Sequence, residues 1–190
     1  MKTIIYIHGL SSSGASGIAK NIQLLLPEFK VVAPDLPIDP NEALSLLLKI
    51  CKELQPDLVI GTSMGGMFAQ RLRGYKKILV NPAFHVSEFM RKNLGVQPFL
   101  NPRENKETEY KITESLCDAY LQLEEKQFEG IDHLEQELTW ALFGENDKLV
   151  NCKEEFCKYY NHALTFPGEL RLTFEDIKDS VVPLGKAMLK

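Results

Sequence analysis

The most informative segment of the chain is DLVIGTSMGG, residues 57–66. It opens with the apolar run Leu58-Val59-Ile60, which is typical of a buried strand. Glycine and small polar residues follow at once, and a helical pattern then continues to about Arg73. The segment therefore predicts a strand at 57–60, a sharp turn, and a helix that packs back onto the sheet.

The same alternation of short apolar runs and longer helical patterns extends in both directions. Helices are expected at about 17–26 and from Pro40 to Leu54, and a last helix at 173–189 is interrupted by Pro183. Strands that alternate with helices indicate an α/β fold, with a mostly parallel sheet of about six strands and helices on both faces. The other predicted strands lie at residues 3–7, 30–33, 77–80, 139–143 and 163–166.

The length of 190 residues corresponds to one domain, spanning residues 1–190. Its least regular part lies at about 83–137, between the fourth and fifth predicted strands. We expect a short helix there, then a polar stretch at 101–111, and a longer helix from Thr113 to about Phe128. This segment is a candidate cap over any site that the sheet carries. The alternative is an elaborated crossover with no role in a site.

Composition argues against several classes of function. The chain has 22 basic and 26 acidic residues, and their mixing argues against an electrostatic grip on nucleic acid. No apolar run approaches the roughly 18–20 residues of a membrane span, and the apolar start is too short for a secretory signal. The four cysteines lack C-x-x-C spacing, so we expect reduced thiols, no metal site and a cytoplasmic protein.

Gly61-Thr62-Ser63-Met64-Gly65 matches the pattern G-x-S-x-G, in which a serine occupies a strained turn between strand and helix. Small residues two positions before and after the serine let neighbouring chains approach the turn closely. The turn lifts the hydroxyl of Ser63 above the sheet edge, as a nucleophile requires. It also places the amide of Met64 at a helix N-terminus, where it can stabilise an oxyanion.

A second loop, residues 8–14, follows the first predicted strand. Acyl transfer at Ser63 needs a second amide donor, and Leu10 is the best candidate. His8 either shapes this loop or takes part in proton transfer. The glycines here do not form G-x-G-x-x-G, and no Gly-Lys-Ser/Thr follows, so a nucleotide site is disfavoured.

A third loop, residues 143–150, follows the fifth predicted strand and contains two acids. A carboxylate at the carboxyl end of a late strand can orient a catalytic histidine. Asp147 is the candidate, and Glu145 is its neighbouring competitor. An acid that is merely solvated in a loop is the alternative.

Together these motifs resemble the α/β-hydrolase superfamily, and more narrowly its small YqiA-type bacterial esterases. The resemblance rests on residues 6–13, on the turn at 61–66 and on Asn81-Pro82-Ala83, and it is least distinct at 83–137. It implies hydrolysis of small-molecule carboxylic esters or thioesters through an acyl-serine intermediate, with no cofactor and no metal.

The sequence departs from this family at the third member of the triad. The resemblance places a histidine after the last strand, in a Gly-x-His-Arg setting, where this chain has Gly168-Glu169-Leu170-Arg171. Leucine can neither accept a proton nor return one. His8 and His85 follow strands and lie on the expected side of the sheet, although His85 has no evident acidic partner in the sequence. His133 and His162 precede strands and should lie at the opposite edge.

The sequence therefore predicts a serine esterase whose activity is impaired by Leu170. A single His→Leu change in an active esterase is one account, and a chain that has lost catalysis but binds ligands in a hydrolase pocket is the alternative. A nucleotide-dependent oxidoreductase is disfavoured, although Asp35 lies at a suitable distance from the first loop. Acyl-chain length and oligomeric state stay open.

Overall fold

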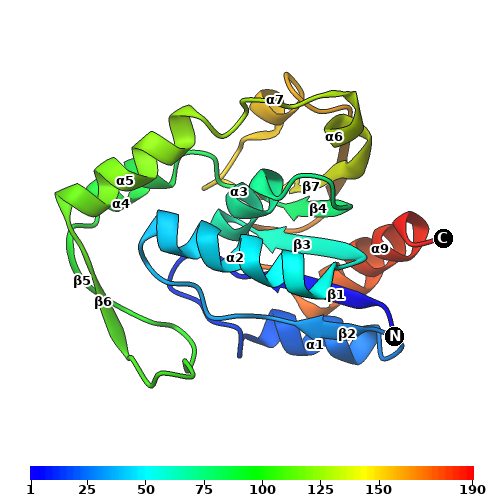
Figure 1. Ribbon diagram of the computed structural model, residues 1–190, viewed down its shortest axis with the longest axis horizontal. Coiled ribbons are helices and arrows are strands. Elements are labelled where there is room, and N and C mark those ends of the chain that lie inside the picture. The colour runs from blue at the N-terminus through cyan, green and yellow to red at the C-terminus, as the bar shows by residue number, and fades with distance from the viewer.

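A computed structural model describes all residues, 1–190, and its centre is a parallel sheet of six strands (Figure 1). The strand order is β2-β1-β3-β4-β7-β8, and every neighbouring pair is parallel. The predicted α/β fold with about six strands is thereby confirmed. The strand bounds are β1 Thr3–Ile7, β2 Lys30–Val32, β3 Leu58–Thr62, β4 Lys77–Val80, β7 Thr139–Gly144 and β8 His162–Phe166.

Each face of the sheet has its own apolar core, because successive strand residues point to opposite sides. Ile5 and Ile7 of β1 belong to a cluster of 26 buried residues, which includes residues of α2 (Pro40–Leu54) and α3 (Met64–Arg71). Ile4 and Tyr6 belong to a second cluster of 16, formed with α1 (Gly17–Leu25) and α9 (Val182–Met188). Helices therefore cover both faces, as the consecutive apolar residues within the central strands predict.

Helix ends follow the capping residues that the sequence offers. Asp39 accepts hydrogen bonds from the amides of Asn41 and Glu42 and caps α2, with Pro40 in the first turn. At the C-terminus the chain enters α8 (Phe174–Asp176), passes through a π-turn, η1 (Ile177–Val181), and continues as α9. Pro183 lacks an amide hydrogen, and the wider turn before it accommodates this break in the helical ladder.

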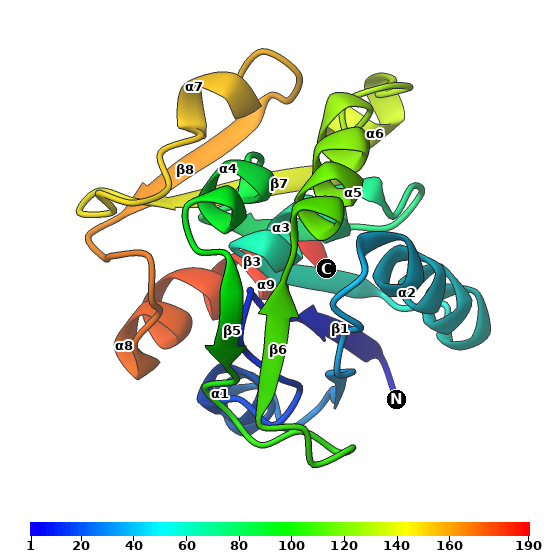
Figure 2. The same cartoon turned by 90° about the vertical axis from the view of Figure 1, so that its left-hand side faces the viewer.

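The segment 83–137 contains α4 (Val86–Arg91), a hairpin of β5 (Gly95–Pro98) and β6 (Glu109–Ile112), α5 (Glu114–Glu125) and α6 (His133–Leu138). Helix α4 near the start of the segment and helix α5 after its polar stretch agree with the prediction, but the antiparallel hairpin was not predicted. The strands of the main sheet point toward α4, α5 and the hairpin (Figure 1), and Figure 2 looks onto this edge. The part of the segment from α4 to α5 thus lies over the carboxyl ends of the strands, whereas α6 precedes the amino end of β7.

One ion pair is buried at the opposite edge of the sheet. Lys77, the first residue of β4, is fully buried, and its ammonium contacts the carboxylate of Glu135 in α6 and the carbonyl oxygen of Leu72. Glu135 also accepts a hydrogen bond from the amide of Gly74. The pair ties α6 and the turn after α3 to the start of β4.

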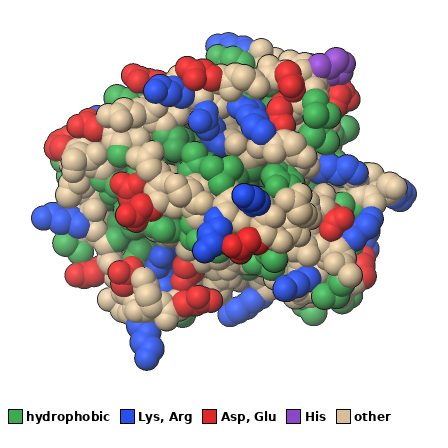
Figure 3. All heavy atoms as spheres, viewed as in Figure 1, with side chains coloured by type: hydrophobic (Ala, Val, Ile, Leu, Met, Phe, Trp, Pro, Cys, Tyr) green, Lys and Arg blue, Asp and Glu red, His purple; other side chains and the backbone are tan.

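Charges of both signs are interspersed over the face shown in Figure 3, with apolar side chains between them. No helix combines the length and the apolar character that crossing a membrane requires.

Candidate functional site

Ser63 lies at the junction of β3 and α3 in a strained conformation. Its φ of 54° falls in the left-handed region, which is rare for a residue with a side chain. The serine amide donates to Val80 of β4 at 3.0 Å, and the serine carbonyl accepts from Gly66 at 2.8 Å and from Ala83 at 3.0 Å. These bonds fix the turn while the serine side chain stays partly exposed. Strain that the surroundings maintain in this way is typical of functional sites.

Both glycines of the G-x-S-x-G motif are required by close approaches. A Cβ atom on Gly61 would lie 2.3 Å from the carbonyl oxygen of Gly65. A Cβ atom on Gly65 would lie 2.1 Å from the carbonyl oxygen of Ile7. Real Cβ contacts do not occur at such distances, so only glycine lets the turn sit directly against β1.

The loop after β1 lies beside the serine. A Cβ atom on Gly9 would be 3.3 Å from Cβ of Ser63 and 3.8 Å from its Oγ. The next residue is Leu10, whose amide donates to no acceptor within the protein. Met64 begins α3, and amides of a first helical turn have no acceptor inside the helix. Two predicted oxyanion donors thus belong to segments that flank Ser63.

Of the two carboxylate oxygens of Asp147, one accepts hydrogen bonds and the other has no hydrogen-bond partner. Its Oδ1 accepts from the amides of Leu149 at 2.8 Å and Val150 at 3.0 Å. Its Oδ2 is buried and has no hydrogen-bond partner. Glu145, the competing acid, is exposed and accepts from the hydroxyl of Thr165 at 2.9 Å. A buried carboxylate oxygen without a partner is costly, so an additional donor would stabilise the turn around Asp147.

The loop that carries Leu170 packs against the turn before Asp147. The amide of Asn146 donates to the carbonyl oxygen of Gly168 at 3.0 Å. A Cβ atom on Gly144 would lie 2.6 Å from the same oxygen. The segments that hold Asp147 and Leu170 are therefore side by side, at the carboxyl ends of β7 and β8.

Asn81 connects this pair of loops to the serine turn, a role that the sequence did not reveal. Its Nδ2 donates to the carbonyl oxygens of Glu169 at 2.9 Å and Leu170 at 3.4 Å, and its Oδ1 accepts from the amide of Gly144 at 2.7 Å. Asn81 is buried and left-handed, with φ of 44°. Two residues later, Ala83 bonds Ser63. The signal in the sequence was an asparagine at a strand end, because asparagine tolerates positive φ better than most residues with a side chain.

His8 is held by backbone groups at both ring nitrogens. Its Nδ1 lies 2.8 Å from the carbonyl oxygen of Gly9, and its Nε2 accepts from the amide of Leu36 at 3.2 Å. Nδ1 must then carry the proton, which describes a neutral imidazole. Burial lowers the pKa of His8, and the nearby Arg103 lowers it further. This arrangement favours the reading of His8 as a residue that shapes the loop.

The buried, neutral His8 predicts a pH dependence of stability. Its folded-state pKa is lowered from 6.5, so above about pH 6.5 neither the folded nor the unfolded chain is protonated there. Below that pH the unfolded chain binds the proton first, and the free energy of unfolding should fall by up to about 1.4 kcal/mol per pH unit from this group. Urea unfolding at pH 7 and pH 5 measures the loss. His8→Asn should show a smaller difference between the two pH values, and an unchanged difference would contradict the assignment.

The other histidines lie elsewhere. His85 does have an acidic partner, contrary to expectation, because Glu155 in α7 (Lys153–Phe156) lies 2.7 Å from its Nε2. The His85 side chain is about half exposed and that of Glu155 is partly buried. His162 begins β8 and stacks on Trp140 at 4.2 Å, and His133 begins α6. Both are therefore at the amino ends of the strands, as predicted.

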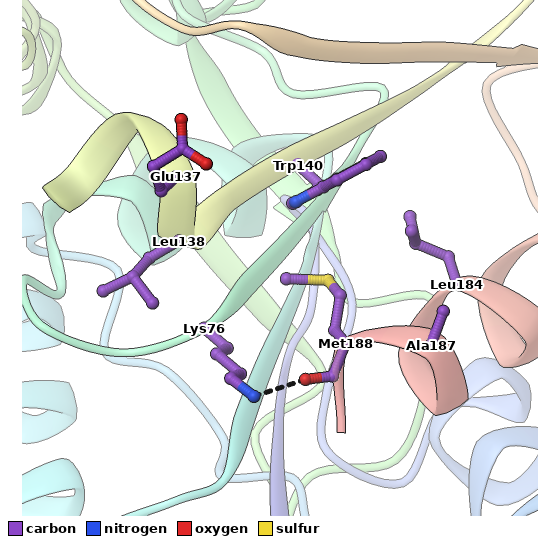
Figure 4. A pocket seen from close by; sticks show the side chains of 7 residues that line it. All are labelled: Lys76, Glu137, Leu138, Trp140, Leu184, Ala187 and Met188. Atoms are coloured by element: carbon purple, nitrogen blue, oxygen red, sulfur yellow. Dashed lines mark hydrogen bonds between the residues drawn. The ribbon is translucent and has the colours of Figure 1, made fainter. Parts of the chain in front are cut away.

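A shallow cavity of about 220 Å³ occupies the amino edge of the sheet (Figure 4). It is lined by residues next to the starts of β4 and β7 and by α9, among them Lys76, Trp140 and Met188. Ser63 follows the carboxyl end of β3, so this cavity is separate from the serine. No three side chains of His, Cys, Asp or Glu are placed to hold a metal ion.

Several solved structures share this architecture. Est1E from Butyrivibrio proteoclasticus is 14% identical with a TM-score of 0.66, covering 99% of this chain and 88% of its own. The esterase domain of a Rhodothermus marinus protein is 15% identical with a TM-score of 0.63, covering 98% and 85%. A thioesterase domain from the curacin biosynthetic pathway is 15% identical with a TM-score of 0.59, covering 100% and 91%. These similarities confirm the predicted α/β-hydrolase fold.

A family model described as "Uncharacterised protein family (UPF0227)" matches residues 3–186. The match extends from β1 into α9 and includes the serine turn, Asn81 and both loops at the carboxyl edge. It confirms the family resemblance that those residues indicate. The chain is a member of the UPF0227 family, built on an α/β-hydrolase fold.

Proposed function

We propose that this protein has the architecture of a serine hydrolase for carboxylic esters or thioesters, and that Leu170 impairs its turnover. The observation that carries the proposal is the buried Oδ2 of Asp147, which has no partner. It belongs to a turn that is bonded to the loop of Leu170. A histidine at position 170 is the group that would give this oxygen a donor and give Ser63 a base.

Each remaining group has a defined role in the proposed reaction. The Oγ of Ser63 attacks the acyl carbon of the substrate, and an acyl-serine forms as the alcohol or thiol departs. The amides of Leu10 and Met64 donate hydrogen bonds to the oxyanion of the tetrahedral intermediate. Water then attacks the acyl-serine and releases the acid. In both steps a base must take a proton and return it to the departing group, and Leu170 can do neither.

The consequence for this chain is a strong loss of rate with retained binding. A positioned general base contributes roughly 10²–10⁴-fold to catalysis. Oxyanion stabilisation uses backbone amides, which the Leu170 side chain does not replace. The similar structures include an esterase domain and a thioesterase domain, which supports a small-molecule ester or thioester as substrate.

A non-catalytic binding protein that keeps the hydrolase pocket is the second candidate. The observation that favours it is Leu170 itself, because the chain lacks a base at the required position. This candidate and the impaired esterase differ in whether Ser63 reacts as a nucleophile once the base is supplied.

A serine-directed fluorophosphonate probe separates these two candidates. We expect slow labelling of the unaltered chain and rapid labelling of Leu170→His, with the adduct on Ser63, because the base increases the nucleophilicity of the hydroxyl. Intact-mass and peptide mass spectrometry measure the rate and the site. Ser63→Ala in the Leu170→His background is the control and should not be labelled. Equal, slow labelling with and without the histidine would favour the binding protein.

A further inference from the structure

The turn that carries the Leu10 amide is strained and closed on itself. The amide of Ser12 donates to the carbonyl oxygen of Gly9 at 3.3 Å, so residues 9–12 form a tight turn. Ser11 occupies its third position with φ of 62°. Glycine or asparagine is favoured at such a position because a side chain there is crowded. A serine persists in this conformation only where its surroundings hold it.

The β5–β6 hairpin holds Ser11 in this conformation. The amide of Leu100, just after β5, donates to the carbonyl oxygen of Ser11 at 2.7 Å. The hydroxyl of Tyr110 in β6 shares a hydrogen bond of 2.6 Å with the Oγ of Ser11. Tyr110 is buried and pairs with Gln97 across the hairpin, so its hydroxyl is placed by the hairpin register. Ser11 is thus held at its backbone and at its side chain by one element.

The contacts continue along the loop. Asn101 donates through Nδ2 to the Oγ of Ser12 at 3.1 Å, and the hydroxyl of Ser13 donates to the carbonyl oxygen of Pro102 at 2.7 Å. Three consecutive serines of the loop after β1 therefore bond to residues 100–110. All of these hydrogen bonds are made to the loop that lies beside Ser63.

We propose that the β5–β6 hairpin positions the oxyanion-binding amide of Leu10, and that Tyr110 is a positioning residue which acts through Ser11. This inference rests on the proposed function, in which Leu10 stabilises the oxyanion. It assigns the segment 83–137 a part in the site, in place of a crossover without a role. Tyr110 touches no reacting atom, since its effect reaches the substrate through the backbone of the turn.

Kinetics in the Leu170→His protein provide the first test. Tyr110→Phe and Ser11→Ala each remove the bond between the two hydroxyls. Loss of a whole oxyanion donor costs roughly 10²–10³-fold in kcat, so a displaced donor should lower kcat by about tenfold and leave KM within about twofold. The double variant should be no slower than either single variant, because one bond is lost in all three.

Tyr75→Phe is the matched control. The Tyr75 hydroxyl donates to the carbonyl oxygen of Cys51 at 3.2 Å, near the start of β4 and away from Ser63. Tyr75→Phe removes a comparable hydrogen bond of a tyrosine hydroxyl and should leave kcat unchanged. Unchanged kcat in Tyr110→Phe and Ser11→Ala, or an equal loss in Tyr75→Phe, overturns the positioning role.

Hydrogen exchange separates failure of this inference from failure of the proposed function. In the chain without the Leu170 change, Tyr110→Phe should speed exchange of the Ser12 and Leu100 amides, which donate to Gly9 and Ser11, while exchange of β3 stays the same. Faster exchange together with an inactive Leu170→His protein means that the hairpin orders the loop but the hydrolase proposal is wrong. Unchanged exchange of the Ser12 and Leu100 amides overturns the inference whatever the activity.

Discussion

Leu170→His is expected to raise kcat/KM for a short p-nitrophenyl ester by about 10³-fold or more. A positioned base is worth roughly 10²–10⁴-fold, and removal of a triad histidine in another serine hydrolase has cost about 10⁶-fold in kcat. The geometry of the proposed nucleophile and acid supports this expectation, because Ser63 is held in a strained turn and Oδ2 of Asp147 is buried without a hydrogen-bond donor. Release of p-nitrophenol measures the gain for acetate and butyrate esters.

The pH profile and two control variants make this result specific. With a histidine base, kcat/KM should rise with pH through the titration range of an imidazole and then level off. Leu170→Asn places a polar side chain at the same position without a base and should give no comparable gain. Ser63→Ala in the Leu170→His background should abolish the new activity. A folded Leu170→His protein with no gain would exclude the triad as proposed.

Glu135→Leu is expected to destabilise the protein by about 3–5 kcal/mol, because it leaves the buried Lys77 ammonium without its counter-charge. Lys77 is fully buried, and its other contact is the carbonyl oxygen of Leu72 at 2.9 Å. Burial lowers the pKa of Lys77, and Glu135 opposes that shift. Urea or thermal unfolding of the unaltered chain and the variant measures the difference.

A double variant and a surface variant test the cause of this loss. Lys77→Met combined with Glu135→Leu removes both charges and should recover most of the stability, since a buried pair can be replaced by apolar residues at little cost. Glu28 forms an exposed pair with Lys186 at 3.6 Å, and Glu28→Ala should cost less than about 1 kcal/mol. If Glu135→Leu costs no more than Glu28→Ala, Lys77 is not held as a buried ion.

Several elements could be predicted because their signals are local. Runs such as residues 4–7 and 78–80 are hydrophobic throughout, as strands covered on both faces require. Asp39 followed by Pro40 marked the start of α2. The β5–β6 hairpin was missed because each strand has four residues and β5 contains Pro98. Alternation over so short a stretch is too weak a signal beside a polar loop.

The candidate site residues also differ in whether their signals are local in the sequence. Ser63 and Met64 were predicted from a motif whose backbone geometry depends on its own two glycines, and Leu10 was predicted from the loop after the first strand. The partner of His85 could not be predicted, because Glu155 lies 70 residues further along the chain. The hydrogen bonds of Asn81 could not be predicted for the same reason, since its side chain donates to a loop 88 residues further along the chain.

The sequence by itself determined the α/β class, the sheet and the serine turn, and it predicted that Leu170 occupies the position of a catalytic histidine, because each depends on residue type or on close neighbours in the chain. Only the tertiary structure decided that Oδ2 of Asp147 lacks a partner, that His8 is held at both nitrogens, and that Tyr110 holds Ser11. Burial and hydrogen bonding join groups that are distant in sequence. Whether a polar atom finds a partner is therefore settled only when the whole chain has packed.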